Sequence, residues 1–272
     1  MNETLLGTQL EKQGWRQGAI IKSEDTLEII SALGIKTPHP ESLVFIVASQ
    51  SCDIANNQLT LDPYVELSIG CVIETLDGNR QFNKNPRVLH TTIEYFDETT
   101  VSIQKFVELK ACEKATIPKE QLLHFTPCVD SALKQIQLNA YVDWLAARYK
   151  RPAHPTKFNE LLNINKLKKK LKPVDNVLSG IYVEITPDKE IADDEKYSVN
   201  LLGLYPVEYN GELEAATKVL GHFETMMREA GMDVTTALMR EDKISVALHK
   251  KFKRFYFDDL SYKNQSQLPP EV

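Results

Sequence analysis

The sequence predicts an α+β protein in which a mostly-β, barrel-like N-terminal domain precedes a helical connector and a smaller α+β domain. Three observations predict this class. Short apolar and alternating runs fill the first 125 residues, helical periodicity begins near Asp130, and strand and helix patterns mix after Pro173. We therefore expect a barrel-like domain over residues 1–125, a basic helical connector over 126–173 and an α+β domain over 174–272.

Two strands are expected early in the first domain. Leu43 to Ala48 is a continuous apolar run followed by polar residues, which is typical of a strand buried on both faces. Residues 64–74 alternate instead, as a half-buried strand does. The apolar face of this second strand carries Val65, Leu67, Ile69, Cys71 and Ile73.

Two further strands are expected at residues 87–93 and 99–109, with Asp97-Glu98 as the hairpin turn between them. An earlier turn is marked by Asp77-Gly78. Several short strands joined by turns at this spacing are typical of a small barrel or a curled sheet.

The connector is predicted from helical spacing that begins near Asp130 and continues to Arg151. Pro152 and Pro155 interrupt this first helix. A second helix is expected to follow, with its lysines facing outward, and to end at Pro173 because proline cannot continue a helix.

The last hundred residues predict strands at 180–186 and 197–207, followed by a helix that begins after Asn210-Gly211 and ends at Gly231. The inner face of this helix is expected to hold Leu213, Ala216, Val219, Leu220, Phe223, Met227 and Ala230. A strand is expected over 232–239, and Asp242 is expected to cap a final helix.

The composition is that of a soluble globular protein. The chain has 272 residues, of which 42% are hydrophobic and 26% charged, and this excludes a mostly disordered or membrane-embedded chain. No apolar run approaches the roughly 20 residues that cross a bilayer, and no secretory signal is recognisable. None of the four cysteines has CxxC spacing. We therefore expect a cytoplasmic protein with no zinc knuckle and no contact with a membrane.

The net charge of −6 conceals a basic segment. Between Arg148 and Lys172 there are nine Lys or Arg residues and one acid, Glu160, so this segment carries +8 and the remainder −14. Such segregation can steer RNA or another polyanion to one face, although a solvated helix face is the alternative. The residues expected to bind nucleic acid are Arg148, Lys150, Arg151, Lys168, Lys169 and Lys170.

The sequence contains no GxGxxG, GxxxxGK[ST], HExxH or GxSxG motif, so a nucleotide-driven motor and a standard zinc hydrolase are not expected. Polar groups gather instead near the ends of the predicted strands, where small barrels build sites. Asp53, Glu66, Arg87 and His90 are the expected catalytic residues. Together they would suffice for phosphodiester cleavage without a metal or other cofactor. Replacing Arg87 or His90 by Ala is then expected to remove activity and leave the melting temperature nearly unchanged.

Arg87, His90 and Asp53 also have structural interpretations. In a regular strand Arg87 and His90 would lie on opposite faces, so their convergence needs an irregular strand start, which Pro86 permits. Without convergence, Arg87 forms a surface ion pair, His90 is a hydrogen-bonded rim residue and Asp53 caps an Asx turn.

A thiol nucleophile is a second catalytic hypothesis, in which Cys52 pairs with His90. Adjacent side chains rarely point in the same direction, so Cys52 and Asp53 are not expected to serve one triad. A metal site made of Cys52, Asp53 and His90 is not expected either.

Two stretches, residues 17–21 (QGAII) and 43–50 (LVFIVASQ), resemble the opening of the MazF/PemK-type toxins, and the resemblance covers about residues 15–110. It implies an SH3-like barrel, metal-independent endoribonuclease activity, dimerisation and an antitoxin partner. This chain has Ala19 where that family favours Asp, and it carries an insertion between Ile21 and Leu43. Residues 85–90 and 144–152 also resemble an uncharacterised group of bacterial proteins.

The sequence therefore predicts a toxin-like or phage-defence-associated protein that processes nucleic acid, with endoribonuclease activity as the expected reaction. One alternative is a non-catalytic interaction subunit of a bacterial defence or toxin–antitoxin complex. Another is an ADP-ribosyltransferase, since Arg16, Ser49-Gln50-Ser51 and a later Glu resemble the residue order of that fold. Incubation with RNA, with and without NAD, separates these three hypotheses.

Overall fold

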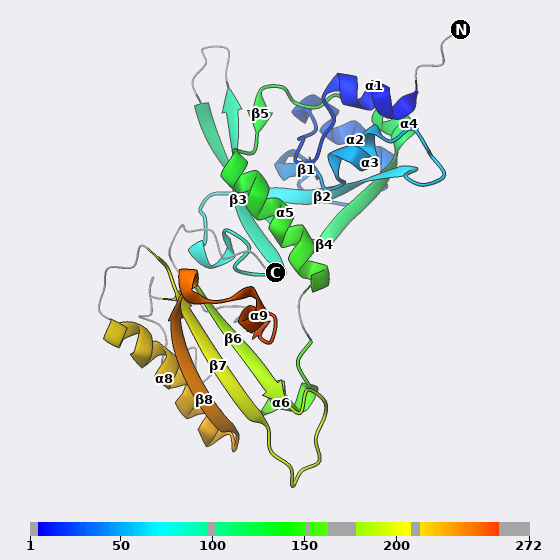
Figure 1. Cartoon of the computed structure of the whole chain (residues 1–272). Helices are drawn as coiled ribbons and strands as arrows, with labels where there is room; N and C mark the ends of the chain where they lie inside the picture. The colour runs from blue at the N-terminus through cyan, green and yellow to red at the C-terminus, as the bar shows by residue number, and fades with distance from the viewer. Residues whose placement is uncertain (1–4, 97–101, 151–152, 163–177, 208–212, 256–272) are drawn as a thin grey trace. The chain divides into compact units, whose positions relative to one another are not determined.

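Figure 1 presents the computed structural model, which describes residues 5–96, 102–150, 153–162, 178–207 and 213–255. The chain divides into two compact units, Met1–Tyr149 and Lys150–Val272. Each unit has its own sheet and its own helices, so the prediction of a mixed α+β protein is confirmed.

The first unit is built on a five-stranded antiparallel sheet that curls into a half-barrel. In spatial order its strands are β1 (Leu43–Val47), β2 (Tyr64–Ile73), β4 (Ser102–Pro118), β3 (Val88–Phe96) and β5 (Ser131–Ala132). Residues 18–22 add to the outer edge of β1, since Gly18 N donates to Val47 O and Ile21 N donates to Phe45 O. The sheet therefore extends beyond β1 through this short segment.

Both faces of this sheet are buried, which explains the continuous apolar run in β1 (Figure 1). On one face α5 (Gln135–Lys150) inserts Tyr141 and Trp144 into a core with Ile46 and Val107. The opposite core contains Phe45 and side chains of four short helices: α1 (Leu6–Gln13), α2 (Thr26–Ala32), α3 (Ser51–Ala55) and α4 (Lys119–Leu122). Alternate residues of β1 thus supply two different cores.

A β-bulge interrupts the pairing of β2 with β4. Leu67 pairs with Ala115 and Cys71 pairs with Glu108, so four steps along β2 correspond to seven along β4. Next to the bulge, a Cβ atom on Gly70 would lie 2.6 Å from Val107 Cγ1, so only glycine fits without a shift of its neighbour.

The second unit has a four-stranded sheet in the order β8 (Asp233–Arg240), β7 (Ser198–Tyr205), β6 (Gly180–Thr186) and β9 (Lys253–Arg254). Helix α8 (Leu213–Glu229) joins β7 to its parallel neighbour β8 and packs on the sheet. The buried residues of α8 are Ala216, Val219, Leu220, Phe223 and Met227, all on the predicted inner face. Phe158 of α6 (Thr156–Leu161) lies in the same core.

The cap of the last described helix differs from the expectation. Helix α9 (Val246–His249) begins after Ser245, whose Oγ accepts a hydrogen bond from Leu248 N. Asp242 lies three residues earlier in a short 3-10 turn, where its carboxylate binds Arg240 instead. The prediction that Asp242 caps this helix is therefore wrong, because its carboxylate is already paired with a guanidinium.

Candidate functional site

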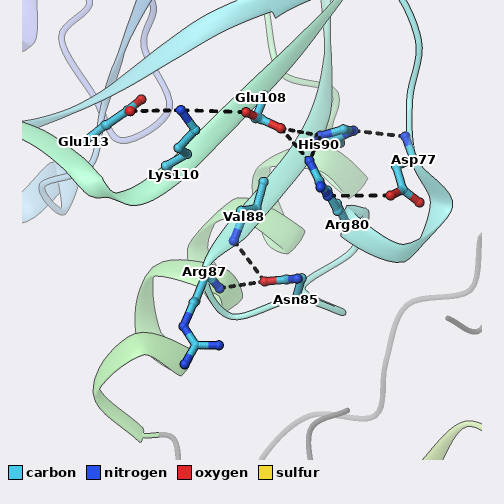
Figure 2. A network of polar contacts seen from close by, with 9 residues as sticks. All are labelled: Asp77, Arg80, Asn85, Arg87, Val88, His90, Glu108, Lys110 and Glu113. Carbon is cyan, nitrogen blue, oxygen red and sulfur yellow. Dashed lines mark hydrogen bonds and ion pairs between the residues drawn. The ribbon is translucent and has the colours of Figure 1, made fainter. Parts of the chain in front are cut away.

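A cluster of charged side chains lies on β3, on β4 and in the turn before β3 (Figure 2). His90 on β3 stands opposite Glu108 on β4, so both side chains point to the same face of the sheet. His90 Nε2 lies 3.0 Å from Glu108 Oε2, and Arg80 Nη1 donates to the same oxygen at 2.7 Å. Asp77 extends the network, with its carboxylate 3.5 Å from Arg80 Nε.

The hydrogen bonds around His90 assign the position of its ring proton. The backbone N–H of Asp77 donates to Nδ1 at 2.9 Å, so Nδ1 carries a lone pair. The proton is then on Nε2, which donates to Glu108. Both ring nitrogens are hydrogen-bonded, and the side chain is only 6% exposed. Neither nitrogen of His90 therefore points toward a substrate.

Glu108 is the anionic centre of the cluster. Burial raises the pKa of Glu108, but the hydrogen bond from His90 and the positive charges of Arg80 and Lys110 outweigh burial, so the pKa lies below its ordinary value. At neutral pH the ionised carboxylate therefore acts only as an acceptor. Lys110 Nζ also pairs with Glu113 at 3.0 Å.

The cluster fastens the turn that contains Asp77 and Arg80 to the β3–β4 hairpin. Its half-exposed side chains are Arg80 and Lys110, 40% and 45% exposed, and the acids Asp77 and Glu113, each 43% exposed. Each exposed cation is therefore paired with an exposed acid, and His90 is positioned to hold Glu108.

Arg80 and Glu108 are not among the residues predicted from the sequence. A usable signal exists only for Glu108. Glu108 and Lys110 alternate with the apolar Val107 and Leu109, which predicts a charged face on this strand.

The four predicted catalytic residues do not share one cluster. Glu66 on β2 pairs with Lys114 Nζ at 2.7 Å. Asp53 lies in α3, and its backbone carbonyl accepts a hydrogen bond of 2.6 Å from Lys119 Nζ. Neither residue belongs to the network that surrounds His90.

The sheet register separates Asp53 from His90. Lys119, which contacts Asp53, follows Pro118, and Pro118 pairs with Tyr64 of β2. Glu108, which contacts His90, pairs with Cys71 of the same strand. Seven positions along β2 separate these two cross-strand pairs, so the contacts of Asp53 and of His90 lie at different places along the sheet.

Arg87 and His90 lie on opposite faces, as the regular alternation of a strand requires. Ala111 N donates to Arg87 O, which keeps Arg87 in the β3–β4 ladder. Asn85 Oδ1 accepts from Arg87 N at 2.8 Å and from Val88 N at 3.1 Å. Figure 2 shows the Arg87 side chain pointing away from Glu108.

The segment before Arg87 is buried and strained. Phe82 and Asn83 have φ values of 50° and 58°, a left-handed conformation that costs energy for side-chain-bearing residues. Asn83 Oδ1 is buried without a hydrogen-bond partner, and Trp144 Nε1 donates to Asn85 O at 3.1 Å. Burial lowers the pKa of Lys84 to about 8. Sequence periodicity contains no signal for a buried lysine in a loop.

The cysteine of the thiol hypothesis and the serines of the transferase hypothesis contact other groups of the protein. Cys52 Sγ lies 3.4 Å from Asp53 Oδ1, next to it in α3. The Oγ atoms of Ser49 and Ser51 accept hydrogen bonds from the backbone N–H groups of Glu66 and Gln17, respectively. Among the described residues, no three His, Cys, Asp or Glu side chains are arranged to hold a metal ion.

The C-terminal end of α5 presents an exposed aromatic ring. The Tyr149 side chain is 80% exposed, and Lys114 Nζ lies 5.7 Å from the centre of its ring. Of the residues predicted to bind nucleic acid, Arg151, Lys168, Lys169 and Lys170 lie outside the described residues, as do the side chains of Arg148 and Lys150.

Comparisons with known proteins add no assignment: no family model, curated protein or solved structure matches this chain. In the described part of the chain, no helix has the length and apolar character needed to span a bilayer.

Proposed function

We propose that the chain is a cytoplasmic protein of the toxin-like or defence-associated type, with an SH3-like barrel as its first unit. It binds single-stranded RNA at the C-terminal end of α5 and serves as a non-catalytic interaction subunit of its complex. The observation that carries this proposal is the exposed ring of Tyr149 beside the ammonium group of Lys114. In the sequence, Tyr149 stands directly between Arg148 and Lys150, at the start of the basic segment.

An exposed aromatic ring among cations is the combination by which proteins bind single strands. The ring stacks on an unpaired base, and the cations attract the phosphates on either side. A duplex keeps its bases stacked inside, so it gains only the electrostatic part. We therefore expect preference for single strands with little dependence on base identity.

We favour binding over cleavage because the polar groups near His90 are already hydrogen-bonded to other groups of the protein. Both ring nitrogens of His90 are hydrogen-bonded inside the protein, and the Glu108 carboxylate already accepts hydrogen bonds from His90 and Arg80. Glu66 is paired with Lys114. In a nuclease such side chains would contact the substrate. Here their contacts support a structural role for His90, Glu108 and Glu66.

The experiment compares three variants of the full chain by fluorescence anisotropy with a labelled single-stranded RNA. Tyr149→Ala should weaken binding by about 5- to 150-fold, because a stacked base contributes about 1–3 kcal/mol. Tyr149→Phe keeps the ring and should bind as the wild type does. Tyr64→Ala, which removes another exposed tyrosine of the first unit, is the matched control and should have no effect. Equal binding by Tyr149→Ala and wild type contradicts the proposal.

RNA cleavage is a second candidate, because Arg80, Glu108 and His90 are the residue types that metal-independent cleavage uses and they lie in contact. Its test is incubation of RNA with the purified chain and analysis of the products. Fragments that end in cyclic phosphate, and that disappear with Arg80→Ala, would support cleavage over binding alone. Intact RNA under conditions where the chain binds it supports the interaction subunit.

A further inference from the structure

A cavity of about 490 Å³ lies in the first unit, between the sheet and the segment that leads into and out of α2. This volume suits a small molecule. Most of its wall is apolar and comes from parts of the chain that are distant in sequence: Ile21, Leu27, Pro40, Leu43, Val44 and Val72.

Two polar groups from the β3–β4 hairpin face this cavity. Tyr95 and Lys105 both line it, and Lys105 Nζ lies 4.3 Å from the centre of the Tyr95 ring. Burial and the neighbouring Cys128 raise the pKa of Tyr95, so its hydroxyl keeps its proton and can donate. The cavity thus holds a hydrogen-bond donor and a cation side by side.

In the part of the chain that the structure describes, no carboxylate pairs with Lys105 and no acceptor receives the Tyr95 hydroxyl. Lys105 is exposed, so its hydrated ammonium group stands where the cavity opens to solvent. The one acid of the cavity wall, Glu41, has a side chain 72% exposed that lies 3.4 Å from His39 Nδ1. The cation and the donor match the carboxylate end of an amphipathic anion, and the apolar wall matches its alkyl end.

We propose that this cavity binds a small apolar carboxylate, of the class of medium-chain alkyl acids. The carboxylate accepts hydrogen bonds from Lys105 Nζ and the Tyr95 hydroxyl, and the alkyl chain packs against Leu27, Leu43 and Val72. The proposal is independent of RNA binding, because none of these residues belongs to the surface around Tyr149.

The test uses Cys128, which lines the cavity, as a reporter. The full chain is treated with iodoacetamide at increasing octanoate, and alkylation of each cysteine is followed by mass spectrometry. Octanoate should slow alkylation of Cys128 and leave the exposed Cys52 and Cys112 unaffected. The uncharged 1-octanol should protect Cys128 only at higher concentration, because it lacks the carboxylate.

Two variants locate the ligand. Lys105→Met should raise the octanoate concentration needed for protection by about tenfold or more, and leave protection by 1-octanol unchanged. Lys12→Met, which removes an exposed lysine of α1, should change neither and serves as the control. Leu27→Trp, at a position 67% exposed, should fill the cavity and abolish protection by both molecules. Circular dichroism and the melting temperature of each variant establish that it is folded.

Absence of protection in the wild type overturns the proposal. It is also overturned when octanoate and 1-octanol protect equally, or when folded Lys105→Met responds to octanoate as the wild type does. Protection that persists in folded Leu27→Trp would place the ligand outside this cavity and would equally overturn the proposal.

Discussion

At the scale of single residues, Lys119 shows how backbone groups hold a buried ammonium group. The Lys119 side chain is 1% exposed, and its Nζ donates to the carbonyls of Asp53 and Asn56 at the end of α3. A cation at the C-terminal carbonyls of a helix satisfies acceptors that the helix itself leaves open. Asp53 therefore contributes its carbonyl oxygen to the contact between α3 and α4.

Replacing Lys119 by Met should destabilise the first unit. The substitution removes the Nζ donor from both carbonyls and leaves Asp53 O only its bond from Asn56 N, so the free energy of unfolding should fall by about 1–3 kcal/mol. Urea denaturation followed by circular dichroism measures the change. Lys110→Met is the matched control, because that side chain is 45% exposed and its loss should change stability by less than about 0.5 kcal/mol. Equal stability of the two variants would contradict this account of Lys119.

Lys84 should make stability depend on pH. Its pKa is about 8 in the folded chain against 10.5 when exposed, so between these values the unfolded chain binds more protons at this amine. The contribution of Lys84 to stability therefore rises with pH across the window. Lys84→Met lacks this titration. The melting temperature of the variant minus that of the wild type should thus be most positive near pH 7 and fall toward pH 10.5. A difference that is constant over this range would refute the lowered pKa.

His90→Ala should lower the melting temperature, contrary to the expectation from sequence. The substitution removes the acceptor of Asp77 N and the donor to Glu108, and empties a buried volume, for a loss of about 2–3 kcal/mol. Arg87→Ala should leave the melting temperature nearly unchanged, since its side chain is exposed. Differential scanning fluorimetry measures both, and an unchanged His90→Ala would favour the catalytic interpretation.

At the scale of elements, hydrophobic periodicity predicts the segments that bury one clear face. Strand β2 begins at Tyr64 and α8 buries Phe223 and Met227, as their patterns indicate. In these segments the apolar residues recur at the spacing of a strand or of a helix, so the local sequence is sufficient to predict the element. The polar run after β1 lacks any such pattern, and its helix α3 could not be predicted.

Strand register could not be predicted, and the site depends on it. A turn centred on Asp97-Glu98 would place His90 opposite Lys105. In the structure the pairing is offset by three residues, so His90 stands opposite Glu108. A shift of this size changes every cross-strand partner along the hairpin.

At the scale of the whole molecule, the segment expected to be one connector contributes to two cores. Tyr141 and Trp144 of α5 are buried in the first unit, and Phe158 of α6 is buried in the second. The boundary between the units falls at residues 149 and 150 because the aromatic side chains on its two sides pack into different cores. The basic segment begins at this same boundary.

The central claim is that this chain binds single-stranded RNA through charge and stacking, and its most direct test is binding measured against salt concentration. The account predicts that the association constant falls steeply with salt, with a logarithmic slope of about −0.7 for each phosphate contacted. The triple variant Lys168→Glu, Lys169→Glu and Lys170→Glu should abolish binding, because it replaces three positive charges of the basic segment by negative ones. Binding that is insensitive to salt, or no binding by the wild type at low salt, would contradict the claim.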